Sequence, residues 1–303
     1  MTLRLPTLML LTLAPLSTCL AAETIYVVTN KTEGNSVAAF HADDDGTLSL
    51  ASEYPTGGLG AGDLEIPALE KNPDHPLANG DDPLISANAI AASADGGWMV
   101  AVNPGDGTLS LMNRAPDGSL QAVNSVTASD RFPISVAIHG HLVASASVGD
   151  SNQAGSIALY RHTPEGLIAI QGSRRDLGAR PSTIAFSRSG AFVIVNELVT
   201  GKIHSFAVSD DGLSADPIAS VDSPRAPAER FHAIPVGFAI GQGDQGETLL
   251  MSEARFLTPE FGLREEADKV PQSPLYSWQT SSVSSYVLDD QGGLTLKTAD
   301  ALT

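Results

Sequence analysis

Cysteine is nearly absent from this 303-residue chain. Its one cysteine, Cys19, follows an apolar stretch, Leu5 to Leu16, and the single charge before that stretch is Arg4. This order, with small residues ending at Ala22, is typical of a secretory signal peptide over residues 1–22 that is cleaved near Ala22. Cleavage would remove the only cysteine. We therefore expect a secreted or periplasmic protein without disulfides, whose stability comes from a hydrophobic core.

Long hydrophobic runs are absent too. A helix that spans a bilayer needs about 20 apolar residues, and even the apolar part of the leader is shorter. Leu16-Ser17-Thr18-Cys19 is similar to a bacterial lipoprotein cleavage box, but Thr18 fits poorly before the cysteine. We favour a chain with no lipid anchor and no membrane partner.

Basic residues are few. The chain has 17 Lys and Arg against 35 Asp and Glu, a net charge of −18. Such a charge repels nucleic acids and anionic membranes over long distances, so neither is an expected partner. The acidity is typical of a solvated surface that keeps an extracellular protein soluble.

One stretch shows how the chain is organised. Within Gly178 to Gly212, two short apolar runs, Ser182–Phe186 and Ala191–Val195, are joined by turn residues and predict a hairpin. A third run, Lys202–Val208, alternates along the chain and ends at another turn before a fourth strand. Four antiparallel strands in about 45 residues is the size of one β-propeller blade.

The pattern recurs along the chain. A glycine followed closely by leucine marks each outer hairpin, with a period of about 47 residues in the middle of the chain. Longer spacings on either side predict loop insertions near residues 56–82 and 256–280. The first repeat has Thr24 to Asn30 but no innermost strand, so we count 19 strands. We predict an all-β propeller over residues 23–303 with about five repeats. The marker glycines are Gly46, Gly118, Gly166, Gly212 and Gly292.

Several of these repeats resemble a known family. Tyr26-Val27-Val28-Thr29-Asn30 and Val195-Asn196-Glu197-Leu198 are similar to the YVTN-type repeats of the seven-bladed lactonase family, which includes 6-phosphogluconolactonase-like and carboxymuconate-cyclase-like proteins. Phe132 to Gly140 and the Ser252-Glu253-Ala254 region resemble a secreted, lactonase-like branch. The family closes a ring of seven blades, so the resemblance implies a C-terminally truncated, incomplete ring.

Two arrangements of the five repeats follow. In an open arc, the first and last repeats lie apart, and the chain could self-associate through its open blade edges. In a closed five-bladed ring, Thr24 to Asn30 would pair with a strand of the last repeat. We favour the open arc.

The connections that enter inner strands and leave second strands lie on one face of each blade. Lactone chemistry requires a group that handles a proton and cations that hold the oxyanion or carboxylate. Glu197 and Arg180 fit by type, and the resemblance implies these roles for them, with Arg255 near the place of a second arginine. The histidine of the family has no equivalent, because Ile134 occupies its place. Further candidates for substrate binding are Asn103, Asn196, His232 and Glu253.

Two readings of these residues remain open. One is a secreted lactonase or cyclase acting on a small lactone or carboxylate; the other is a non-catalytic propeller that binds a partner, with the charges pairing across blades. No cofactor motif is present. His139-Gly140-His141 is interpreted as a hairpin tip and Asp43 to Gly46 as a turn, so no metal is expected. Gly57 to Gly62 is interpreted as a flexible loop.

Overall fold

A computed structural model gives the fold of residues 24–62, 87–149, 154–198, 200–225, 233–244, 246–254 and 281–302. These residues form five antiparallel sheets, each built from consecutive strands. The predicted signal peptide and the insertion near 256–280 lie outside the described residues. No helix in the described part of the chain is long and apolar enough to cross a membrane.

The first two sheets show the basic unit. The first has the order β1-β2-β3 and the second the order β4-β5-β6-β7. The strands of the first are β1 (Thr24–Val28), β2 (Ser36–Ala42) and β3 (Leu48–Pro55); those of the second are β4 (Ile90–Ala92), β5 (Trp98–Asn103), β6 (Thr108–Arg114) and β7 (Leu120–Thr127).

The outer strands of the third and fourth sheets are each interrupted. Both pieces pair with the same neighbour, β10 or β15. Gly172, at φ 76°, turns the chain in the first break, and Pro217, which has no N–H to donate, lies in the second. The two breaks raise the predicted 19 strands to 21. The strands are β8 (Pro133–His139), β9 (Leu142–Ser147), β10 (Ser156–Thr163), β11 (Gly166–Ala169) and β12 (Arg175–Asp176), then β13 (Pro181–Phe186), β14 (Phe192–Glu197), β15 (Lys202–Ser209), β16 (Gly212–Leu213) and β17 (Ala219–Asp222).

The fifth sheet has the order β18-β19-β20-β21. Three of its strands are longer than any strand of the other sheets. Its strands are β18 (Ile234–Gly243), β19 (Gly246–Ala254), β20 (Ser281–Leu288) and β21 (Leu294–Leu302).

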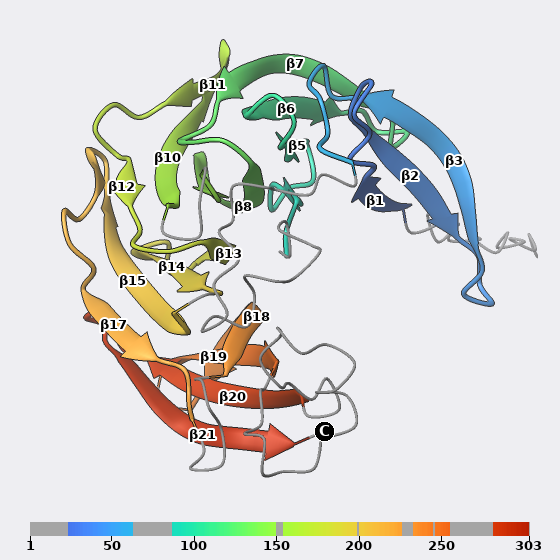
Figure 1. Ribbon diagram of the computed structural model, residues 1–303. Helices are drawn as coiled ribbons and strands as arrows, with labels where there is room; N and C mark the ends of the chain where they lie inside the picture. Colours follow the sequence, from blue (N-terminus) through green and yellow to red (C-terminus); the bar gives the residue numbers. More distant parts are fainter. Residues whose placement is uncertain are drawn as a thin grey trace, which may run out of the picture.

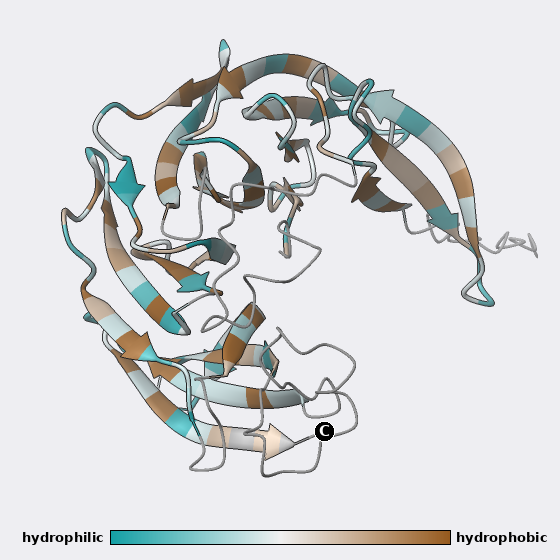
Figure 2. Cartoon of the chain, viewed as in Figure 1, coloured by the Kyte–Doolittle hydropathy of each residue, from teal (hydrophilic) through white to brown (hydrophobic). Residues whose placement is uncertain are grey.

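The core consists of apolar layers between successive sheets. The second strands of the middle three sheets, β5, β9 and β14, are buried on both faces because a sheet covers each side. Figure 2 shows the resulting bands of hydrophobic residues along the strands of all five sheets. Five positions on inner and second strands are fully buried in this core: Val100, Val136, Ile184, Val193 and Val195.

The hairpin turns between strands are tight. Gly190, between β13 and β14, has φ 74°, a conformation that glycine adopts without strain. A Cβ at this position would lie 2.3 Å from the ring of His139. Glycine is therefore required here both by the turn and by the close approach of the neighbouring sheet.

The five sheets follow one another around an arc, and the fold is a β-propeller (Figure 1). The first and fifth sheets lie at opposite ends of this arc. Within the described ranges, β1 pairs with β2 and no hydrogen bond joins the first sheet to the fifth. The five-bladed ring closed through Thr24 to Asn30 is therefore not formed by these residues.

The described part of the first insertion, Thr56 to Gly62, is held in place, contrary to the prediction of a flexible loop. Gly60 donates to the carbonyl of Lys31 at 2.8 Å, and Gly62 donates to the carbonyl of Asn30 at 2.9 Å. A Cβ on Gly60 would lie 2.1 Å from the backbone of Asn30. The glycines permit a close approach of two backbones.

Candidate functional site

The start of the inner strand pairs with the end of the second strand in the same way in three sheets. We call this end of the sheets the mouth of the arc. Pro133 pairs with Ser147, Pro181 with Glu197 and Pro235 with Glu253. A bulge follows each proline, since the register shifts by one residue there. A residue at or next to the end of the second strand is thus fixed beside a proline in three sheets.

A buried polar residue occupies this position, at or next to the end of the second strand, in four sheets. Asn103, Ser147, Glu197 and Glu253 are each at most 3% exposed. Three of them contact hydroxyls or a ring on the third strand or the turn before it. Asn103 donates to Ser110 Oγ at 2.8 Å, and Glu253 Oε2 accepts from Ser282 Oγ at 2.6 Å and from Ser284 Oγ at 2.8 Å. Together these four residues form a buried polar layer at one end of the apolar interfaces between sheets.

Glu197 has an ionisable partner in this layer. His204 Nε2 lies 3.2 Å from Glu197 Oε1, within ion-pair distance. The other carboxylate oxygen accepts a hydrogen bond from the hydroxyl of Thr200. Burial works to raise the pKa of Glu197, but the contacts with His204 and Thr200 outweigh it, so the pKa lies below its ordinary value of 4.5. The carboxylate is ionised at neutral pH.

The backbone of Arg180 adjoins Glu197. Arg180 immediately precedes Pro181, the partner of Glu197 in the β13–β14 register, and its carbonyl accepts from Leu198 N–H at 2.9 Å. The side chain is 1% exposed. The structure therefore brings together the backbones of the two residues that the sequence singled out for catalysis.

The two asparagine candidates are used for bonds between elements. Asn103 Oδ1 accepts from Asn35 Nδ2 at 2.9 Å and from Thr56 Oγ1 at 2.8 Å. Asn196 Oδ1 accepts from Thr183 N–H at 3.1 Å, and its amide donates to the carbonyl of Pro235. Both side chains are fully buried. By strand position Asn103 corresponds to Glu197 and not to Asn196.

The remaining candidates are placed as follows. Glu253 lies in the polar layer described above, whereas Arg255 and His232 lie outside the described residues. Ile134, at the place of the family histidine, is buried in a small cluster with Phe132 and Val148. His139 and His141 flank the turn at Gly140, as predicted. They lie against different rings, Phe186 and His162, and the described residues contain no group of three ligands able to hold a metal ion.

Sequence reasoning missed His204 and Thr200. The signal was present in the hairpin pairing, because Val195 lies opposite His204 and Glu197 lies two residues further on the same side of β14. That places the imidazole diagonally across from the carboxylate. His204 Nδ1 is also buried, without a hydrogen-bond partner in the part of the chain that the structure describes.

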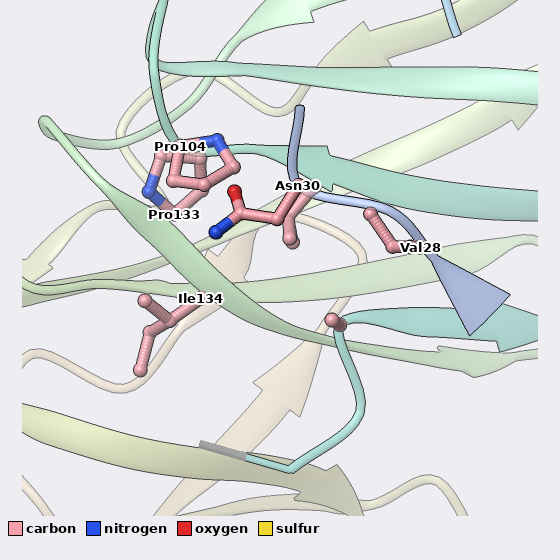
Figure 3. A pocket seen from close by; sticks show the side chains of 7 residues that line it. Val28, Asn30, Pro104, Pro133 and Ile134 are labelled. Atoms are coloured by element: carbon pink, nitrogen blue, oxygen red, sulfur yellow. The ribbon is translucent and has the colours of Figure 1, made fainter. Parts of the chain in front are cut away.

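A pocket opens near the same end of the first three sheets (Figure 3). Its volume is about 130 Å³, and its lining is mostly apolar. Asn30 contributes the one side-chain amide of the lining, and its Oδ1 accepts a hydrogen bond from the Ala61 N–H at 2.8 Å. The labelled lining residues are Val28, Asn30, Pro104, Pro133 and Ile134.

No protein-family model matches the chain, and no curated protein matches it. Among solved structures, a protein of Lactobacillus plantarum superposes with a TM-score of 0.60 at 16% identity, over 92% of this chain and 68% of that one. A Bacteroides uniformis protein described provisionally as a 6-phosphogluconolactonase has a TM-score of 0.50 at 15% identity, over 93% and 82%. The Pseudomonas aeruginosa periplasmic gluconolactonase PpgL has a TM-score of 0.50 at 14% identity, over 92% and 84%.

The comparisons and the sheet order agree on the class of protein. The chain is a β-propeller, and the solved structures similar to it include lactonase propellers. At these identities the likeness concerns the fold, while activity depends on the residues of the site.

Proposed function

We propose that this β-propeller is a secreted or periplasmic enzyme that opens, or in reverse closes, the lactone ring of a small anionic substrate. One observation carries the proposal: Glu197, an ionised and buried carboxylate at the mouth of the arc, with His204 at 3.2 Å. Such a pair holds a carboxylate in one orientation and in the form that accepts a proton. The similar solved structures that are described as lactonases support the substrate class.

The proposed reaction uses the chain's own residues. Glu197 takes a proton from a water molecule, and the water oxygen attacks the lactone carbonyl carbon. The guanidinium of Arg180 stabilises the resulting oxyanion. The ring C–O bond then breaks, and the leaving oxygen receives the proton back from Glu197. One water is consumed and an open-chain hydroxy acid is formed, without a cofactor.

A non-catalytic propeller is the second candidate. The observation that favours it is the equivalence of Glu197 with Asn103 and Ser147, which occupy the same position and form structural hydrogen bonds. Glu197 is 3% exposed and both its oxygens are engaged. On this reading, the polar layer fixes the sheets and the loops at the mouth bind a partner.

The proposal is tested by measuring the hydrolysis of sugar δ-lactones through the protons that the reaction releases. For an essential general base, Glu197→Gln should lower kcat/KM by about 100-fold or more, with Glu165→Gln, an exposed turn carboxylate, as the matched control. Circular dichroism would show whether both variants are folded. Absence of hydrolysis by the wild type, with Glu197→Gln changing thermal stability alone, would favour the binding platform.

A further inference from the structure

The first sheet lacks a counterpart of the innermost strand of the other four, among the residues that the structure describes. β3 packs beside β7, as β7 packs beside β11, so β3 is an outer strand. Counting inward along β3-β2-β1, β1 occupies the place of the second strand. In the other sheets the inner place is taken by β4, β8, β13 and β18, each antiparallel to its second strand.

The outward edge of β1 offers backbone groups for pairing. Thr29 N–H donates to the carbonyl of Ser36 on β2 at 2.9 Å. Because backbone groups alternate between the two edges of an antiparallel strand, the N–H and C=O of Tyr26 and Val28 point to the other edge. An unpaired edge of this kind is a template for an added strand. No proline, lysine or bulge protects β1.

The pocket of about 130 Å³ lies at the end of this edge. Val28, at the end of β1, lines it together with Val102 and Ile134 from the second and third sheets. A buried apolar cavity of roughly 150 Å³ accommodates a benzene ring. The pocket therefore matches one apolar side chain, such as proline, valine or leucine.

We propose that the edge of β1 and this pocket bind an extended, uncharged peptide segment of a partner protein. The segment pairs antiparallel to β1 through the backbone of Tyr26 and Val28 and inserts an apolar side chain near its own N-terminal end into the pocket. This is strand addition, in which main-chain bonds give affinity and a pocket gives specificity.

The chain's own inner strands indicate the chemistry of the partner segment. β4, β8, β13 and β18 contain no Asp, Glu, Lys or Arg, and β8 and β13 begin with proline. The inner strands of a second copy are already paired within its own sheets. In a two-fold pairing of β1 with β1, the residue brought toward the pocket would be Thr24, which is small and polar. A separate, uncharged peptide fits this site better than a second copy.

A synthetic peptide with the sequence of Pro181–Phe186, Pro-Ser-Thr-Ile-Ala-Phe, is the probe. By analogy with the β13–β14 register, its third and fifth residues face the β1 backbone. N-methylation of these two amides should weaken binding by about tenfold or more, whereas N-methylation of the fourth and sixth should change it little. Calorimetry measures the affinities, and amide exchange should show protection of Tyr26 and Val28 when the peptide is bound.

A substitution in the pocket distinguishes the contribution of the pocket to peptide binding from that of the β1 edge. Ala89→Leu, which fills part of the pocket lining, should weaken binding, whereas Val123→Leu, on the exposed part of β7, should not. Equal binding of both N-methylated peptides would overturn strand addition. So would Tyr26 and Val28 amides that are protected without peptide. Dimerisation that protects these amides as concentration rises would assign the edge to a second copy and overturn the peptide partner.

Discussion

At the mouth of the arc, one buried polar side chain sets the chemical group that each of four sheets presents. The residue at or next to the end of the second strand is an amide in one sheet, a hydroxyl in another and a carboxylate in two. The same backbone geometry therefore presents groups with different chemistry. Glu197 differs from Glu253 in its described contacts, since His204 lies beside the first and two serine hydroxyls beside the second.

Glu197 should make stability depend on acid pH. Its pKa in the folded protein is below 4.5, so its contribution is complete above the unfolded value and is lost as pH falls through the folded value. Chemical denaturation from neutral to acid pH should show Glu197→Gln less stable at pH 7 by about 1–3 kcal/mol. Its deficit should shrink in acid. A deficit that stayed constant with pH would show that the charge of Glu197 is irrelevant to folding.

His162 should produce a second pH effect near neutrality. Its ring stacks on Trp98 with centroids 4.2 Å apart. Burial and the nearby His141 lower the pKa of His162 below 6.5, and Asp95 partly offsets this. Because the pKa is lowered, the contribution of neutral His162 to stability is complete above pH 6.5 and declines as the pH falls below that value. His162→Phe should flatten this decline in thermal melts, whereas His41→Gln, an exposed histidine, should leave it unchanged.

At the scale of strands, burial on both faces makes β5, β9 and β14, the second strands of the middle three sheets, the most sensitive elements. Val195 on β14 is fully buried, so Val195→Ala should reduce the free energy of unfolding by about 2 kcal/mol. Val27 on β1 is 47% exposed, and Val27→Ala should change it by less than about 0.5 kcal/mol. Urea denaturation of the two variants measures the difference. Equal losses would mean that β1 is covered in solution.

Strand positions could be predicted from the sequence because apolar runs and glycine turns are local signals. The breaks in the outer strands were missed, since Gly172 and Pro217 interrupt pairing without ending the sheet. The equivalence of Asn103 with Glu197 could not be predicted from residue type, because it depends on which strand edge each backbone faces. His204 was missed because diagonal pairing across β14 and β15 depends on register.

At the scale of the whole molecule, the open arc leaves one apolar sheet face in solvent. In the register of the first sheet, Phe40 pairs with both Ile25 and Leu50, so these residues share a side. Ile25, Val27, Leu48 and Leu50 are each at least 40% exposed. An apolar face of this extent favours association.

Self-association should therefore depend on this face. The double variant Leu48→Lys, Leu50→Lys should shift sedimentation toward the monomer. Val123→Lys with Ile168→Lys adds the same charge at two other exposed positions and serves as the control. Equal effects of the two double variants would attribute association to net charge and not to the first sheet.

Each sheet consists of consecutive strands, and among the described residues no strand is exchanged between sheets. During synthesis, a sheet can therefore form as soon as its own segment has left the ribosome, without waiting for the C-terminus. Each new sheet then finds the previous one already folded as a template. We expect a translation intermediate stalled once Asp222 has left the ribosome to hold the first four sheets in a protease-resistant form, which makes folding a vectorial process that follows the direction of translation.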